Sequence, residues 1–243
     1  MSADLRPQGV AAGWRRLVLL GTPPAFAALT LFHPEQHPGQ LEDATRWMTV
    51  HVGQLVFSVL LAYCVWFLLQ GIAGRAAGVA RGTLPVFLVF FSAFDAVAGL
   101  ATGWLAGADH HGAVETGVAD QAITELFDHN WLAGNASVTG SVGGIAWAVV
   151  AVSAAVALRG AGADRLTVSF MAASLLFMVH PPPIGTIGLL ALSAATVRWD
   201  RQLRRGRPHG SDRRASEPPS RTSAQLWEST AEAKMSSPSD LER

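Results

Sequence analysis

The stretch LPVFLVFFSAFDAVAGLATGWLAGA, residues 84–108, decides the class of fold. It contains one charged side chain, Asp95, and it is longer than the roughly 20 residues that cross about 30 Å of hydrocarbon as a helix. Over the whole chain half of the residues are hydrophobic and 15% are charged, whereas about a quarter are charged in soluble domains. We therefore expect an all-α integral membrane protein.

Three further runs have the same apolar character, at residues 17–32, 47–73 and 136–158. A fifth run, residues 166–197, is interrupted by three prolines at 181–183, which remove backbone donors and should break a helix. A turn there gives six spans in a polytopic transmembrane helix bundle. The number falls to five if the first run is a signal peptide cleaved near Ala27.

The distribution of basic residues predicts the orientation of the spans. With a turn at the prolines, every Lys and Arg except Arg46 falls on the side of the two termini, and basic loops remain cytoplasmic. Both termini are therefore expected in the cytoplasm. The basic residues are nearly all arginine and alanine is abundant, as is usual in high-GC bacteria, so we expect a bacterial plasma membrane.

The same reasoning divides the chain into three parts. They are a cytoplasmic N-terminus at 1–16, a membrane domain at 17–205 with outer loops 33–46 and 109–135, and a disordered cytoplasmic tail at 206–243. The tail is rich in Arg, Ser and Pro, a composition that cannot bury enough apolar surface to fold. Trp47, Trp104 and Trp131 should mark the outer interface, whereas Trp66 and Trp147 fall deeper and should be packing residues.

Composition and motifs exclude several functions. The formal net charge is zero and the single cysteine, Cys64, lies in an apolar run, which leaves no basic surface for nucleic acid and no cysteine cluster for a metal. There is no Walker loop, GxSxG or HExxH motif. These absences weigh against an enzyme without deciding the question, and the partner that the sequence implies is the lipid bilayer.

Small residues repeat at a spacing of four on two of the spans. The first stripe is Gly99, Gly103 and Gly107, and the second includes Gly140 and Gly144. Small residues in register allow helices to approach closely in lipid. We expect these stripes to join neighbouring spans of one chain, with a homo-oligomer face as the alternative.

The candidate site is built on polar residues within the apolar runs. His51, Gln54 and Ser58 share one face of a helix, and this stripe descends toward the depth of Asp95. A carboxylate at mid-membrane costs about 2.5 to 3.5 kcal/mol, so it should face other helices and find a partner. His51, Gln54 and His180 are the expected partners, and the sequence leaves the ionisation state of Asp95 open.

Three interpretations of these residues stay open. Asp95 and His51 can form a proton or cation relay in a small transporter, the usual role of an intramembrane ionisable group. His33, His51 and His180 can bind a transition metal or a haem in a membrane oxidoreductase. The residues can also be a purely structural hydrogen-bonded clamp. Among activities we favour transport of ions, protons or small solutes through an outward-facing pocket, with the oxidoreductase as the alternative.

Three segments carry a resemblance to other proteins. They are HVGQL at 51–55, AFDAVAGLATG at 93–103 and HPPPIGTIGLL at 180–190. These segments resemble a group of multi-pass membrane proteins of high-GC bacteria to which no activity is assigned. The resemblance implies a shared helix bundle over the second to sixth spans and implies no catalytic residues.

Overall fold

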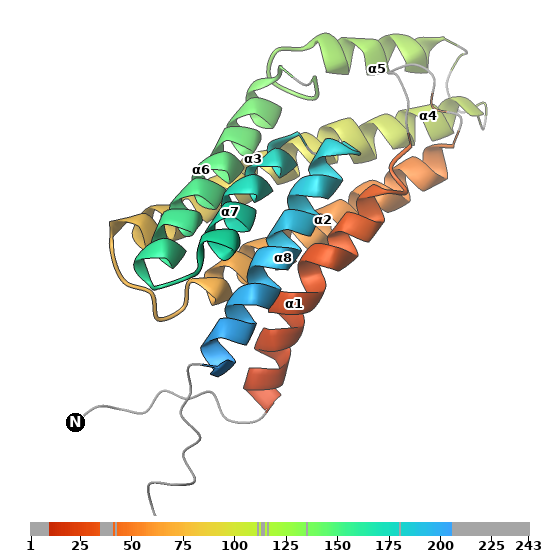
Figure 1. The fold of residues 1–243 in the computed structure, drawn as a ribbon. Coiled ribbons are helices and arrows are strands. Elements are labelled where there is room, and N and C mark those ends of the chain that lie inside the picture. Colours follow the sequence, from red (N-terminus) through yellow and green to blue (C-terminus); the bar gives the residue numbers. More distant parts are fainter. Residues whose placement is uncertain are drawn as a thin grey trace, which may run out of the picture. The chain divides into compact units, whose positions relative to one another are not determined.

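The computed structural model contains helices and no strands over the residues that it describes, which are 10–34, 41, 43–110, 112, 115, 117–134, 136–179 and 181–205 (Figure 1). The elements are α1 (Val10–Thr30), α2 (Ala44–Leu68), α3 (Arg75–Asp95), the π-helical turn η1 (Ala96–Ala101), α4 (Thr102–His110), α5 (Val118–Asp128), α6 (Val138–Gly160), α7 (Arg165–Ala173), the 3₁₀ turn η2 (Ser174–Met178) and α8 (Ile184–Arg205). The all-α class expected from the sequence is confirmed.

Within the part of the chain that the structure describes, three helical runs are long and apolar enough to cross a membrane: Ala44–Leu68, Arg75–Ala108 and Val138–Gly160. Their outward faces are apolar as well. On α6 the exposed large side chains are Ile145, Val149, Val152 and Val156, which follow the spacing of one helix face. Continuous exposed apolar stripes are rare on soluble monomers, and they are compatible with a surface covered by lipid.

α3 and α6 pack antiparallel against each other. This pair makes the most extensive contact in the chain, and it depends on glycine in α6. A side chain at Gly140 would stand 3.1 Å from the ring of Phe94, and one at Gly143 would stand 3.0 Å from the backbone of Phe91. Gly140, which belongs to the second stripe, thus contacts another helix of the same chain, and Gly143, which lies outside the stripe, does the same.

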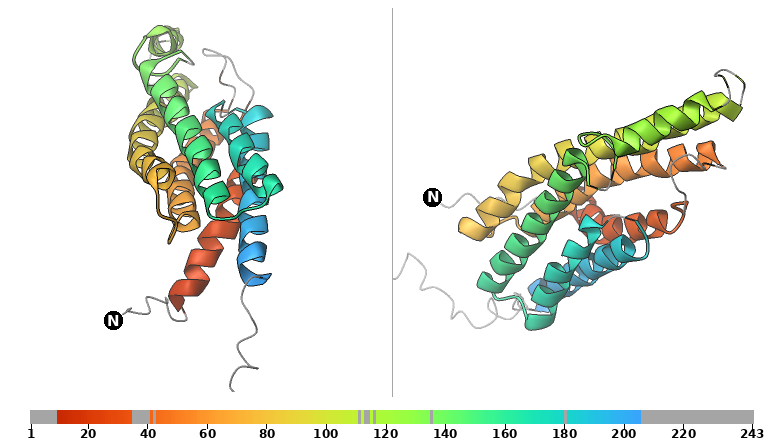
Figure 2. Two further views of the ribbon diagram at one scale, coloured as in Figure 1. Left: turned by 60° about the vertical axis from the view of Figure 1, so that its left-hand side comes forward. Right: turned by 90° about the horizontal axis from the view of Figure 1, so that it is seen from above.

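The prolines at 181–183 separate two helical arms. α7 continues into η2 and ends at Met178, and α8 begins at Ile184, so the predicted turn is present. The run Arg165–Met178 is about 23 Å long at α and 3₁₀ rises, which is shorter than the hydrocarbon layer. α8 then runs antiparallel beside α1 (Figure 2), and the hydroxyls of Thr30 and Thr186 share a hydrogen bond of 2.8 Å.

The predicted outer loops need correction. The loop expected at 33–46 ends at Asp43, whose carboxylate caps α2 by accepting from the N–H of Arg46 at 2.8 Å. The loop expected at 109–135 contains α5, an amphipathic helix whose buried side chains include Ile123. One helix so short adds too few apolar residues to be visible in hydropathy. Residues 1–9 and the predicted tail at 206–243 lie outside the described residues.

One end of the bundle gathers the arginines of several helices. Arg15 of α1 donates to the carbonyl of Phe67 at 2.9 Å, and Arg81 of α3 donates to the carbonyl of Leu69 at 3.0 Å. Both acceptors lie at the C-terminal end of α2, where cations are favoured by the helix dipole. These contacts join α1, α2 and α3 at one end.

Asp164 organises the neighbouring helices at the same end. Its Oδ1 accepts from the N–H of Thr167 at 2.7 Å and caps α7. Its Oδ2 pairs with Arg198 of α8 at 2.8 Å and accepts from Gln202. The hydrogen bond from the Thr167 N–H lowers the pKa of Asp164 below its ordinary value, and the Arg198 side chain lowers it further by a smaller amount.

This lowered pKa gives a testable pH dependence. A depressed carboxyl pKa contributes stability above the ordinary value of about 3.9, and the contribution is lost as the pH falls through the folded pKa. Asp164→Ala should therefore lower the thermal midpoint in detergent at pH 7, and the difference from the parent should narrow below about pH 4. Asp128→Ala, on the exposed end of α5, should change little at either pH. If the thermal midpoint of Asp164→Ala lies below that of the parent by the same amount at every pH, the assigned role of the Asp164 carboxylate is wrong.

Candidate functional site

The polar stripe predicted on α2 faces the interior of the bundle. His51, Gln54 and Ser58 are each at most 2% exposed, and they lie within an otherwise apolar helix. The hydroxyl of Ser58 donates to the carbonyl of Leu55 at 2.8 Å, so its hydrogen-bonding need is met locally. His51 and Gln54 present their polar atoms to the neighbouring helices.

Asp95 lies on the facing helix, at the point where α3 changes to a π-helix. Its side chain is fully buried, and η1 follows directly from Ala96. Positions four apart in an α-helix are offset by about 40° around the axis, so a stripe at that spacing drifts away from its partner. The wider π-helical turn reduces the drift and keeps Asp95 and the glycines that follow it turned toward α2.

The indole of Trp47 stabilises this π-helical turn. The N–H of Thr102 bonds to the carbonyls of Val97 and Gly99, which bypasses the carbonyl of Ala98 that a regular α-helix would use. Trp47 Nε1 donates to that carbonyl at 3.2 Å. A buried carbonyl without a partner costs about 1 to 3 kcal/mol, so the indole removes a penalty that the turn would otherwise carry.

The first glycine stripe brings the two helices into contact. A Cβ at Gly99 would overlap the imidazole of His51, and one at Gly103 would stand 2.5 Å from the side chain of Met48. At Gly107 the nearest neighbour would be the Cβ of Ala44 at 3.7 Å. The stripe therefore faces α2 of the same chain, and the absence of side chains makes room for the histidine ring.

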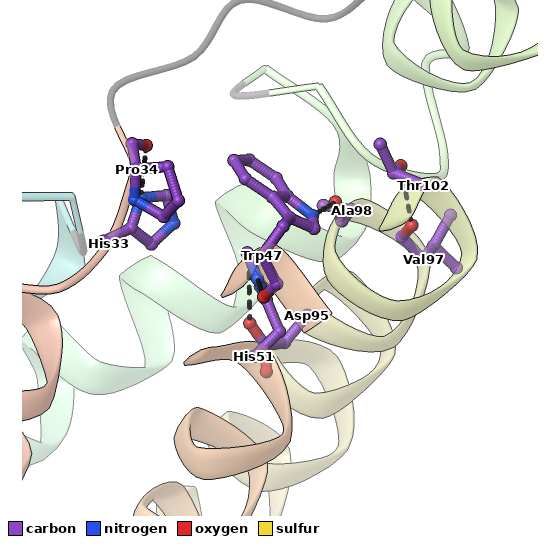
Figure 3. Close-up of polar contacts among 8 residues, drawn as sticks. All are labelled: His33, Pro34, Trp47, His51, Asp95, Val97, Ala98 and Thr102. Carbon is purple, nitrogen blue, oxygen red and sulfur yellow. Dashed lines mark hydrogen bonds and ion pairs between the residues drawn. The ribbon is translucent and has the colours of Figure 1, made fainter. Parts of the chain in front are cut away.

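His51 has one ring nitrogen held and the other directed at Asp95 (Figure 3). Nδ1 lies 2.8 Å from the carbonyl of Trp47, and because a carbonyl can only accept, Nδ1 carries the proton of that hydrogen bond. In the neutral ring Nε2 then has the free lone pair. Nε2 lies 3.9 Å from Asp95 Oδ1, which is too long for a hydrogen bond but within reach through a small approach or one bridging water.

Two buried side chains in this interface have unmet hydrogen-bonding capacity. Neither carboxylate oxygen of Asp95 and neither polar atom of the Gln54 amide has a hydrogen-bond partner among the described residues. Buried polar atoms are nearly always paired in native proteins, and the exceptions tend to have functional explanations. The His51 and Asp95 pair can hold one proton on either the carboxyl or the imidazole with the same total charge, which is the arrangement that a proton-exchange site requires.

His33 lies beside the pair, just beyond the end of α1. Its ring centroid is 5.1 Å from that of His51 and 5.2 Å from that of Trp47, both edge to face. Its Nδ1 donates to the carbonyl of Pro34 at 3.0 Å. Partial burial lowers the pKa of His33 below that of an ordinary histidine, against the smaller raising effect of that carbonyl. The ring is half-buried and connects the site to the end of the bundle.

The predicted metal site is built only in part. The structure brings His33 and His51 together, whereas His180 lies outside the described residues. Among the residues that are described, no group of three or more His, Cys, Asp or Glu side chains is placed to hold a metal ion.

Sequence reasoning missed the role of Trp47. The expectation placed it at the outer interface, but the side chain is buried, with 6% exposed, beneath the π-helical turn. Trp104 and Trp131 are each more than 60% exposed, in keeping with interfacial positions. The spacing of four between Trp47 and His51 could have placed both on one face. Nothing in the sequence marks the π-helical turn that Trp47 supports.

Comparison of the chain with models of protein families, with curated proteins and with solved structures gives no match. The function is therefore inferred from the geometry of the site itself.

The contact at Gly99 gives a direct test of this geometry. Gly99→Ala should push the His51 ring away and destabilise the protein by about 1 to 3 kcal/mol, as overpacking does. Gly82→Ala, on the same helix but with open space around the new methyl group, should be neutral or stabilise by about 0.5 to 1 kcal/mol. Thermal unfolding of both variants in detergent measures the difference. Equal stability of the two variants would contradict the close approach of α2 and α3.

Proposed function

We propose that this chain is an integral membrane protein of the transport class, in which His51 and Asp95 exchange a proton within the membrane. The observation that carries the proposal is the pair itself, a buried imidazole nitrogen 3.9 Å from a carboxylate that has no hydrogen-bond partner among the described residues. Ionisable groups at membrane depth are expensive and usually mark ion or proton pathways.

The unmet hydrogen bonds favour exchange over a fixed clamp. A structural clamp would hold Asp95, Gln54 and His51 together by direct hydrogen bonds, which stabilise a buried polar group only when they are made. Gln54 and Asp95 make none with the described residues, so their polar atoms remain able to accept or pass a proton or to hold a water molecule. A proton, a hydronium ion or a small cation fits this chemistry better than a large solute.

The proposed topology has six membrane elements with both termini in the cytoplasm of a bacterium and the plasma membrane as the location. The contacts of Arg15 and Arg81 with the end of α2 and of Arg198 with Asp164 support a single basic end, which the positive-inside rule places in the cytoplasm. Because α7 with η2 is short, we place the turn at 181–183 within the outer part of the bilayer. His33 then gives the pair access from the outer side.

Proton flux tests the proposed function. In liposomes that contain the protein and an internal pH indicator, an imposed potential should drive acidification faster than in protein-free liposomes. Asp95→Asn keeps the shape and loses the titrating group, so it should reduce the protein-dependent rate at least about 100-fold, the lower range for loss of an acid–base group. Asp128→Asn makes the same chemical change on the exposed end of α5 and should leave the rate unchanged.

Two outcomes would overturn the proposal. One is a wild-type rate no greater than that of empty liposomes. The other is an Asp95→Asn variant that conducts like the parent, which would assign Asp95 a structural role. Size-exclusion profiles and thermal midpoints of both variants distinguish loss of function from loss of fold.

Sidedness is tested separately by thiol labelling. In a Cys64→Ala background, a cysteine at Glu115 should react with an impermeant thiol reagent in intact cells, because it lies in the proposed outer segment. A cysteine at Gly160, the last residue of α6, should react only after the cells are opened. Labelling of position 160 alone in intact cells would reverse the proposed orientation.

A further inference from the structure

A cavity of about 370 Å³ lies between α3, α6 and η2, away from His51 and Asp95. Of the described residues that line it, five are aromatic: Phe87, Phe91 and Phe94 of α3, Trp147 of α6 and Phe177 of η2. The rings of Phe87 and Trp147 are 5.1 Å apart, and those of Trp147 and Phe177 are 5.5 Å apart. The volume lies at the lower end of the roughly 300 to 1,000 Å³ of small-ligand pockets.

Ser141 of α6 and the backbone before the three prolines supply polar groups to the cavity wall. Met178 and Val179, which both line it, precede the three prolines. In a helix, the N–H groups three and four residues further on would donate to these carbonyls. Those positions are proline here, so the N–H donors are missing. A Cβ at Gly144 would stand 3.3 Å from the oxygen of Met178, which places that oxygen against the cavity wall formed by α6.

The aromatic rings and the backbone carbonyl both favour a positive charge in the cavity. The faces of aromatic rings are electron-rich and attract cations, and carbonyls at the C-terminal end of a helix carry partial negative charge. Among the described residues that line the cavity there is no Asp, Glu, Lys or Arg. The cavity therefore suits a cation whose charge is spread over an apolar body. A bare metal ion would need more oxygen ligands than a backbone carbonyl provides.

The cavity opens on the surface that the membrane would cover. Three of the lining residues are exposed, Ile145 by 57%, Met178 by 42% and Val179 by 45%, and Ile145 belongs to the outward apolar stripe of α6. A ligand dissolved in the bilayer could enter from the side without crossing an aqueous loop.

We propose that this cavity binds a hydrophobic organic cation, such as an aryl-substituted quaternary ammonium, from the outer part of the bilayer. The rings hold the apolar body, and the carbonyl of Met178 lies beside the charge. The site shares no residue with the His51 and Asp95 pair, so it stands whether or not the protein moves protons.

A pair of probes of equal shape tests the proposal. Benzyltrimethylammonium and neopentylbenzene differ only in the charged nitrogen that replaces a quaternary carbon. With the full chain in lipid nanodiscs, and with binding to empty nanodiscs subtracted, the cation should bind saturably and at least about tenfold more tightly than the neutral probe.

Variants locate the binding. Ser141→Phe fills the cavity and should abolish saturable binding, whereas Val152→Phe, on the lipid-facing stripe of the same helix, should leave it unchanged. Phe91→Leu keeps an apolar side chain but removes one ring. It should weaken the cation about fivefold and leave the neutral probe unaffected. Thermal midpoints of the three variants show which of them are folded.

Three results would overturn the proposal. The first is no saturable binding of the cation by the wild-type protein. The second is equal affinity for the two probes, which would assign the cavity to any apolar molecule, acyl chains included. The third is cation binding that survives in a folded Ser141→Phe variant, which would place the ligand elsewhere.

Discussion

The close approach of α2 and α3 is the constraint on which the site depends. Gly99 leaves the space that the His51 ring occupies, and the π-helical turn after Asp95 keeps the carboxylate turned toward that ring. Trp47 stabilises the π-helical turn, because its indole N–H donates to the carbonyl of Ala98. The contact between His51 and Asp95 thus depends on the π-helical turn, on Gly99 and on Trp47 together.

The same helix serves two different surfaces. Asp95 and the glycines that follow it face α2, whereas the phenylalanines of α3 face α6 and η2, where the aromatic cavity lies. Both sites occur where a helix departs from regular geometry, at η1 in one case and at η2 with its prolines in the other. Such departures expose backbone carbonyls inside an apolar bundle, and those carbonyls must find donors or become sites for ligands.

Much of this could be predicted from the sequence, because length and hydropathy decide where apolar helices lie. The facing positions of His51 and Asp95 followed from a helical stripe and from the cost of an unpartnered carboxylate. Other features could not be predicted. Trp66, expected to pack inside, is half exposed, because hydropathy does not show which face of an apolar helix meets lipid. α3 begins at Arg75, well before its apolar run, because helical geometry does not require apolar residues.

The state of the His51 ring tests the central claim most directly. Nitrogen-15 magnetic resonance of the imidazole, with the protein in lipid bilayers, distinguishes its two nitrogens. The account predicts a proton on Nδ1, bonded to the Trp47 carbonyl, and an Nε2 signal that shifts when Asp95 is replaced by Asn. An Nε2 signal that is identical in the wild-type protein and in Asp95→Asn would contradict the contact between histidine and carboxylate, and with it the proposed exchange of a proton between them.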